Sequence, residues 1–386
     1  AHLGARAFDS IGGEVVQTTA FVLENNHKPD YKGRYLRLVD GKSETEKEAY
    51  IREAIKSPEC GWLHCASSID FKKIPRSPIA YWASKQVFTL FKVNGGIGTI
   101  VKPRQGMSTN DNKRFLRNWS ELSFSKVGFN FSSSNTAKDS GLKWFPYNKG
   151  GSYRKWYGNN ELMLNWTNDG EEIKKWLVNN PKDPNTSHWS RRIINTDFYF
   201  KESITWADIT TNSFSARYSP QGSLFDVKGS SAFPSKDMFS SILGLMNTRV
   251  MHLFMKILNP TVTFQVGDIA RVPFIELSLA SNNVSFVVDR LINFSRLDWD
   301  NYEISWDFQV NPLIMGWSND NVVQQHKLSN IYTDYQTQNS EIITQMQQLE
   351  EENNRIFIEA YGLQDELSVD VPLKEITLTC NPYYRY

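Results

Sequence analysis

Apolar stretches are short throughout residues 78–308, and few of them are long enough to form a helix. Gly, Asn, Ser and Pro interrupt this region repeatedly, which is typical of short strands joined by turns. Residues 236–258 are the exception, and we predict one long buried helix there, capped by Ser235 and stopped by Asn259-Pro260. We expect His252 on this helix to be a packing residue rather than a ligand. The pattern predicts an α+β fold with short strands and a buried long helix.

A different pattern runs from residue 328 to about residue 361. Apolar residues recur there every seven positions, at Leu328, Tyr335, Ile342, Leu349 and Ile356. Such a repeat favours a helix that buries one stripe of its surface. The companion positions are mixed, with polar Gln338 and Gln345 among them. We therefore predict an extended helix packed on one partner surface, not a free two-stranded coiled coil.

The first eighty residues contain two further elements. Residues 13–23 are β-branched and apolar and lie between Gly12-Gly13 and a polar turn, so they predict a strong strand. Residues 43–55 predict a helix, since acidic residues in its first turn suit the helix dipole. The predicted segments are therefore residues 1–75, residues 76–310 and residues 311–386. Because residue 1 is Ala and both ends look interrupted, we expect the chain to be part of a longer protein.

Composition excludes several classes of protein. Aromatic residues make up 13% and hydrophobic residues 40% of the chain, which is enough for a folded core. No run of about 18 apolar residues is present and no signal peptide is visible, so we expect a cytoplasmic protein outside the membrane. Cys60, His64 and Cys65 have the residue types of a zinc site. No second ligand pair follows at a suitable spacing, so we expect no bound metal.

Positive charge is concentrated in residues 101–117, although the whole chain carries 43 Lys+Arg against 42 Asp+Glu. A local excess on a nearly neutral chain favours a site for an anion over general polyelectrolyte binding. We expect Gly106 to adopt backbone angles that other residues resist. An ordinary solvated turn before a helix is the alternative. The candidate DNA-binding residues of this segment are Lys102, Arg104, Gln105, Ser108, Thr109, Asn110, Asn112, Lys113 and Arg114.

Residues 143–157 repeat the signal, since they contain four cations and no acid, interleaved with aromatic residues. Aromatic rings can stack on bases while cations contact the phosphate backbone. In the alternative, the rings fill a core instead. The candidates here are Lys143, Tyr147, Asn148, Lys149, Arg154, Lys155 and Trp156, and Arg191 and Arg192 join them from a later segment. Two such segments so close in sequence favour nucleic acid as the partner.

Several stretches of the chain resemble the adenine-specific DNA methyltransferases of BREX phage-defence systems. Residues 3–23 resemble the end of the catalytic domain in this family, and residues 105–115 resemble the entry to its target recognition domain. Later landmarks are Ile204-Thr-Trp-Ala-Asp-Ile209, Leu243-Gly-Leu-Met-Asn-Thr248, Gly267-Asp-Ile-Ala-Arg-Val-Pro273, Gly141-Leu-Lys-Trp-Phe-Pro-Tyr-Asn-Lys-Gly-Gly151, Leu297-Asp-Trp-Asp300 and Ile304-Ser-Trp-Asp-Phe308.

The resemblance implies that residues 1–75 contain the last strand or strands of a Rossmann-like methyltransferase domain and that residues 76–310 recognise double-stranded DNA. It also implies a longer enzyme that transfers a methyl group from S-adenosylmethionine to adenine N6, after the base leaves the duplex. The family's Asn-Pro-Pro-Tyr motif and its glycine-rich cofactor loop are missing from this sequence. Asn381-Pro-Tyr-Tyr384 and Gly95-Gly96-Ile97-Gly98 are weak substitutes for them. We therefore expect this chain to bind no cofactor and to be inactive by itself.

Side-chain chemistry divides the candidates into two roles. The cations expected on phosphates are Lys102, Arg104, Lys113, Arg114, Lys149, Arg154 and Lys155. The residues expected at base edges are Gln105, Ser108, Thr109, Asn110, Asn112, Asn148 and Arg192. Two other functions stay open, namely a carbohydrate- or peptide-binding module built on the aromatic residues and a scaffold that contacts other BREX proteins through residues 328–361.

Overall fold

The computed structural model describes residues 1–10, 17–26, 28, 31–210, 213–277, 281–318 and 327–385. The chain divides into two compact units, residues 1–94 and residues 95–386. The division falls after the predicted boundary at residue 75, and the region from residue 311 belongs to the same unit as the predicted recognition domain. No helix within these described ranges has the length and apolar character needed to cross a membrane. The same ranges contain no group of three or more His, Cys, Asp or Glu residues that could hold a metal ion.

In its described residues, the first unit contains two small antiparallel sheets and three α-helices. Its elements are β1 (His2–Gly4), β2 (Thr18–Thr19), β3 (Lys32–Leu36), α1 (Glu44–Lys56), β4 (Leu63–Ser67), α2 (Ser68–Phe71) and α3 (Lys85–Val93). β1 pairs with β2, and β3 pairs with β4. The predicted helix at residues 43–55 is confirmed as α1, where Ser43 Oγ accepts a hydrogen bond from the Glu46 amide.

The predicted strand at residues 13–23 is only partly described. Residues 11–16 lie outside the described ranges, and Thr18–Thr19 form a two-residue strand. Phe21, Val22 and Leu23 are not in a strand and are strongly exposed. The described part is therefore much shorter than the sequence suggested, because these apolar side chains lack a covering surface.

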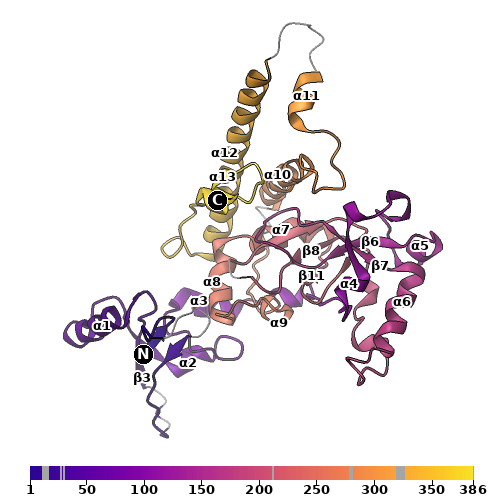
Figure 1. The fold of residues 1–386 in the computed structure, drawn as a ribbon. Helices are drawn as coiled ribbons and strands as arrows, with labels where there is room; N and C mark the ends of the chain where they lie inside the picture. The colour runs from indigo at the N-terminus through magenta and orange to yellow at the C-terminus, as the bar shows by residue number, and fades with distance from the viewer. Residues whose placement is uncertain are drawn as a thin grey trace. The chain divides into compact units, whose positions relative to one another are not determined.

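The second unit contains two sheets and most of the helices (Figure 1). Its strands are β5 (Leu116–Asn118), β6 (Trp144–Asn148), β7 (Leu162–Asn165), β8 (Ser203–Trp206), β9 (Ala216–Ser219), β10 (Leu224–Phe225) and β11 (Ser231–Ala232). Its α-helices are α4 (Asn112–Phe115), α5 (Ser134–Asp139), α6 (Thr167–Val178), α7 (Lys236–Met246), α8 (Arg249–Leu258), α9 (Val266–Ile269), α10 (Ser281–Asp300), α11 (Pro312–Ser318), α12 (Leu328–Tyr361) and α13 (Pro382–Arg385).

The four-stranded sheet of this unit has the order β10-β6-β7-β5, in which only β10 and β6 run parallel. Its face packs on a core that includes Phe145, Leu164 and Phe225, and α6 adds Ile173 and Leu177. The three-stranded sheet has the order β11-β8-β9 and is antiparallel. Small sheets mixed with helices confirm the α+β class predicted from the sequence.

The predicted single helix at residues 236–258 is wrong, because the chain forms α7 and α8 with a break between them. The Asn247 side chain hydrogen-bonds both backbone groups of Ala216, at 2.9 and 3.0 Å, and so takes the helix end onto β9. Thr248 then caps α8, and its Oγ1 accepts from the Met251 amide at 3.2 Å. The two helices are nevertheless largely buried, and His252 on α8 is half-buried.

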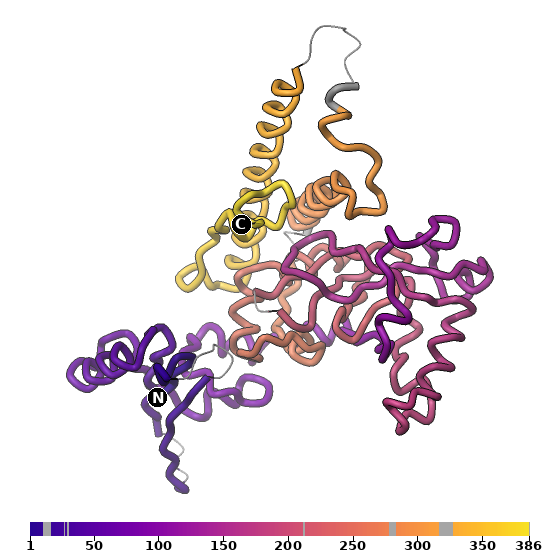
Figure 2. Tube along the Cα trace, in the orientation of Figure 1, coloured from indigo at the N-terminus to yellow at the C-terminus, as the bar shows by residue number. Residues whose placement is uncertain are grey.

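The predicted long helix is confirmed as α12, although its buried stripe differs from the predicted one. α12 packs on α7, α8, α10 and α11, and Figure 1 shows it beside α10 and α11. Its buried residues include three polar ones, Glu350, Asn353 and Asn354, whereas Leu328 is exposed. The stripe is displaced because these polar side chains have fixed partners on neighbouring elements. The chain after α12 then returns along the helix, as Figure 2 shows, and Val369 O and Val371 O accept hydrogen bonds from it.

Candidate nucleic-acid interface

The basic segment at residues 101–117 is held against two strands of the second unit. Arg104 exchanges backbone hydrogen bonds with Ser231 at 2.8 and 2.9 Å, and the Met107 amide donates to Phe225 O at 3.0 Å. Gly106 has no positive φ, so the expected reason for glycine is wrong. A Cβ at Gly106 would lie 1.8 Å from Phe225 O, and glycine is therefore required by the close approach of the two backbones. The segment is a fixed part of the fold.

A polar cluster forms where this segment meets residues 183–192. Asn110 Nδ2 donates to Asp183 Oδ2 at 3.0 Å, and its Oδ1 accepts from Ser108 Oγ at 2.9 Å. Arg192 donates to the same carboxylate oxygen from Nε at 3.1 Å and from Nη2 at 2.7 Å. Thr186 Oγ1 adds a fourth donor at 2.8 Å. Three predicted residues, Ser108, Asn110 and Arg192, therefore meet around a carboxylate that was not predicted from the sequence.

The hydrogen bonds of the Asp183 carboxylate favour its ionised form. Hydrogen bonds from Arg192 and Thr186 hold the pKa of this carboxyl below its usual value. Asn110 itself has a φ of 53°, in the left-handed region that Asn adopts more readily than most residues. The cluster is therefore ordered by charge and by backbone geometry together.

Lys149 connects the second predicted segment to the first. Its Nζ donates to Asn112 Oδ1 and to Asp226 Oδ2, each at 3.0 Å, and Thr109 Oγ1 also donates to Asn112 Oδ1 at 2.7 Å. Tyr147 donates to Asp226 Oδ2 at 2.7 Å, and its pKa is raised well above its usual value by burial and by the nearby Asp226 charge. The two segments therefore do meet at Lys149, while Tyr147, Asn148 and Thr109 are buried beneath the surface.

Several predicted cations have no carboxylate partner among the residues that the structure describes. They are Lys102, Arg104, Lys113, Lys143 and Arg191, of which all but the half-buried Arg104 are exposed. Arg114 differs, since it pairs with Glu172 at 3.0 Å and lies 4.7 Å from the Trp176 ring centre. The unpaired cations retain their full charge for an external anion.

Lys201 and Phe198 extend this surface and were not predicted from the sequence. The Arg104 guanidinium lies 5.1 Å and the Lys201 ammonium 5.2 Å from the centre of the Phe198 ring. Asn195, three residues earlier, donates from Nδ2 to Gln105 O at 2.8 Å and so fixes this loop beside the basic segment. An isolated Lys near one aromatic residue gives no signal in the sequence, because only the fold brings it next to Arg104.

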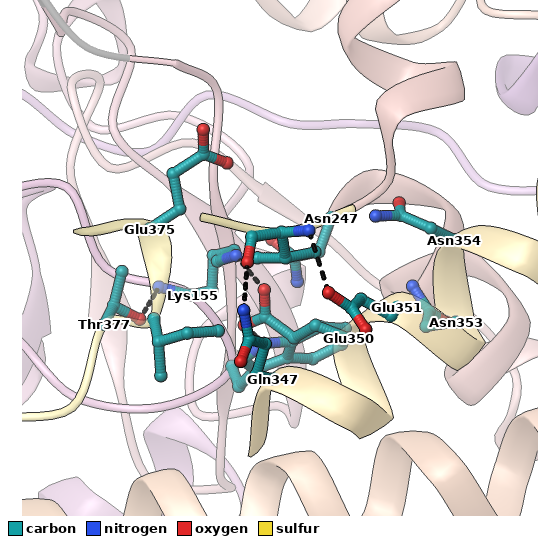
Figure 3. A network of polar contacts seen from close by, with 12 residues as sticks. Lys155, Asn247, Gln347, Glu350, Glu351, Asn353, Asn354, Glu375 and Thr377 are labelled. Carbon is teal, nitrogen blue, oxygen red and sulfur yellow. Dashed lines mark hydrogen bonds and ion pairs between the residues drawn. The ribbon is translucent and has the colours of Figure 1, made fainter. Parts of the chain in front are cut away.

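The predicted DNA contacts of Arg154, Lys155 and Trp156 are wrong. Lys155 Nζ is buried against the Glu350 carboxylate of α12, and Trp156 Nε1 donates to Glu350 Oε1 at 2.8 Å (Figure 3). Arg154 Nη1 lies 3.5 Å from Asp298 Oδ2, and its Nη2 donates to Thr379 Oγ1 at 2.7 Å. Since each cation is only 4% exposed and has a buried carboxylate beside it, neither can reach a phosphate.

The family's cofactor motifs have no fitting substitute in the described residues. The Asn381 amide donates to Leu373 O and Ile376 O, each at 2.8 Å, so its donors are not free for a nucleobase. A Cβ at Gly96 would lie 2.3 Å from Ala270 O, so glycine at this position is required by backbone packing. A cavity of about 620 Å³ lies elsewhere in the second unit, between α8, residues 259–264 and Lys374-Glu375. None of the predicted DNA-binding residues lines it.

Similarity to known proteins extends over the whole chain, although no family model matches it. The adenine-specific methyltransferase PglX of Lacticaseibacillus casei (strain Zhang) is 38% identical over 383 residues, which cover 98% of this chain and 31% of PglX. The adenine-specific methyltransferase BrxX of Escherichia coli O9:H4 (strain HS) is 35% identical over 395 residues, which cover 100% of this chain and 29% of BrxX. This chain is therefore similar over its whole length to one part of PglX and of BrxX.

The resemblance inferred from the sequence motifs is therefore confirmed. The chain spans less than a third of the length of PglX and of BrxX. Among solved structures, the type IIL restriction-modification enzyme MmeI in complex with DNA aligns with a TM-score of 0.42 and 12% identity, over 75% of this chain and 36% of the MmeI chain.

Proposed function

We propose that this chain is the DNA-recognition part of a site-specific adenine-N6 DNA methyltransferase of a BREX system. The names of PglX and BrxX supply the reaction, and their identity over the whole chain supports a shared role. S-adenosylmethionine would be bound by another part of the longer protein. In this chain, Asn381 donates hydrogen bonds to backbone oxygens and Gly96 is required by backbone packing. Residues 1–75 would complete the catalytic domain, and the second unit would hold the duplex.

The observation that carries this proposal is that hydroxyl, amide and guanidinium side chains are joined by Asp183 and Lys149, close in sequence to cations that have no carboxylate partner among the described residues. Lys102, Lys113 and Arg191 would contact phosphates, together with Arg104 and Lys201. Ser108, Asn110, Asn112 and Arg192 would face base edges, because they present donors and acceptors of the kind that the major groove requires. These groups come from segments far apart in sequence and are held together by Asp183 and Lys149.

The carbohydrate- or peptide-binding alternative is disfavoured by burial. Such modules need an exposed aromatic platform, whereas most of the rings in residues 143–157 are in the core. The buried ones are Trp144, Phe145, Tyr147, Trp156 and Tyr157. A contact with other BREX proteins is compatible with DNA recognition. Leu328 and Tyr332, exposed near the start of α12, would supply it.

The proposal is tested by the salt dependence of DNA binding in the full-length protein. We expect the double variant Lys102→Ala/Lys113→Ala to weaken binding to all duplex sequences alike. The slope of log K against log salt should fall by about 1.8, which is about 0.9 for each phosphate that is no longer neutralised. A matched control, Lys327→Ala/Lys374→Ala, removes the same charge from the C-terminal region and should leave the slope unchanged. Equal slopes in the two variants would reject this surface as the DNA interface.

A further inference from the structure

Asp183 lies at the centre of the proposed reading surface, and four donors converge on one of its oxygens. They are Asn110 Nδ2, Thr186 Oγ1, Arg192 Nε and Arg192 Nη2, at 2.7 to 3.1 Å. An ordinary surface ion pair needs one such contact and contributes little. A carboxylate with four donors from three residues instead fixes the positions of its neighbours.

The geometry of the Arg192 contact leaves a defined part of the guanidinium free. Nε and Nη2 both donate to Asp183, so the side edge of the group is occupied. Within the described part of the chain, Nη1 has no acceptor, and the Arg192 side chain is 41% exposed. The end of the guanidinium, formed by Nη1 and the second Nη2 hydrogen, therefore retains two parallel donors.

Two parallel N–H donors match the O6 and N7 acceptors of guanine in the major groove. A phosphate could also accept them, but the paired Asp183 charge cancels that of Arg192 and weakens its attraction for the backbone. The pair is therefore better suited to select a base than to add general affinity.

We propose that Asp183 is a positioning residue that turns Arg192 so that the free end of its guanidinium reads a guanine in the target sequence. This inference rests on the proposed function. It names one base of the target sequence, a guanine, and it names Asp183 as the residue that positions the side chain recognising that base. Asn110, held by the same carboxylate, lies beside Arg192 at the reading surface.

The test maps methylated adenines in the genome of a bacterial host that expresses the full-length protein. We expect a wild-type consensus sequence that contains a guanine. Asp183→Asn keeps the shape but removes the charge, and Arg192→Lys keeps the charge but removes the paired donors. Both variants should relax the same guanine position, with discrimination against other bases falling by about 5- to 150-fold. The other positions of the consensus should stay as in the wild type.

Glu171→Gln is the matched control, because it neutralises an exposed carboxylate that pairs with Lys175 on the adjacent α6. It should leave the consensus unchanged. A uniform loss of methylation in a folded Asp183→Asn protein would assign Asp183 a structural role and overturn the inference. An unchanged consensus in both variants, relaxation at two different positions, or a consensus without guanine would overturn it as well.

If Asp183→Asn fails to fold, an unchanged consensus in Arg192→Lys would still overturn the inference, since that variant leaves the carboxylate and its other donors in place. The salt-slope experiment separates this inference from the proposed function. Equal slopes in the two lysine double variants would reject the interface as a whole. Different slopes, together with a guanine position that both variants leave intact, would reject only the guanine-reading role of Arg192 and Asp183.

Discussion

Lys155 and Lys102 have the same side chain in similarly basic segments, yet their surroundings differ completely. Lys102 is exposed, whereas Lys155 is buried and paired with Glu350, 195 residues later in the chain. The sequence around Lys155 contains no acidic residue, because the partner of Lys155 lies on α12, far along the chain. A run of cations therefore predicts an anion site only where the fold leaves the cations unpaired.

The buried pair leads to a prediction about stability. Lys155→Met should lower the free energy of unfolding by about 3–5 kcal/mol, because it leaves the Glu350 carboxylate buried without a cation. Lys155→Met/Glu350→Gln should recover most of this loss, since the neutral amide still offers Trp156 an acceptor. Urea unfolding of the wild type and the two variants measures both values. A single variant within about 1 kcal/mol of the wild type would show that solvent reaches Glu350.

Some single residues of the proposed interface could be predicted from the sequence, and others could not. Ser108, Asn110, Asn112, Lys149 and Arg192 were selected by residue type and local charge, and the structure brings them together. Asp183 was not selected, because an acid next to a nucleic-acid surface contradicts a simple charge rule. Its role depends on Arg192 and Asn110, which lie 9 and 73 residues away in the sequence.

The basic segment at residues 101–117 is held in place by its contact with β10. Gly106 allows the segment to approach Phe225 closely enough for the Met107 amide to reach Phe225 O. Glycine was correctly identified as important, but for a reason that only the fold reveals. Backbone angles are a local property and can be guessed from sequence, whereas the approach of a strand from a distant part of the chain cannot.

Gly106→Ala should therefore destabilise the second unit by about 2–3 kcal/mol, because the added methyl group collides with a backbone oxygen that cannot move freely. DNA binding should weaken as well, since the segment that contains Ser108 and Asn110 would be displaced. Gly267→Ala on α9 is the control. Nothing lies within 4 Å of its added Cβ, so a change of less than about 1 kcal/mol is expected. Thermal or urea unfolding compares the two, and equal effects would refute the argument from close approach.

The helices show which structural features can be predicted from a repeat of apolar residues and which cannot. α12 was predicted to within a residue because a seven-residue repeat persists over its whole length. The break between α7 and α8 was not predicted, since Asn247 and Thr248 are compatible with a helix until their contacts with Ala216 and Met251 are known. Polar residues such as Asn353 at the α12 contact face could not be recognised as buried from the repeat, because their hydrogen-bond partners lie on other elements.

In the whole molecule, α12 is part of the second unit and is not an appendage. Glu350 pairs with Lys155, Asn353 donates to Gly244 O at 3.0 Å, and Asn354 accepts from the Arg249 amide at 3.0 Å. These contacts connect α12 to the basic aromatic segment and to both halves of the broken helix. The boundary predicted at residue 311 separates regions that the fold joins into one compact unit.

We therefore expect a fragment of residues 95–385 to unfold cooperatively in urea and a fragment of residues 95–327 to lose cooperative unfolding. The shorter fragment would expose Lys155 and Trp156 and the apolar surface that α12 covers on α7 and α8. Near-ultraviolet circular dichroism of the many buried aromatic residues provides the measurement. A shorter fragment with the same transition as the longer one would show that α12 is dispensable for this unit.

The distance along the chain between Lys155 and Glu350 also has a consequence for biosynthesis. The 195 residues between them take roughly 10–40 s to translate at about 5–20 residues per second. During that interval Lys155 and Trp156 have been synthesised while their partner Glu350 has not. Folding around this pair is therefore completed only after α12 has been synthesised.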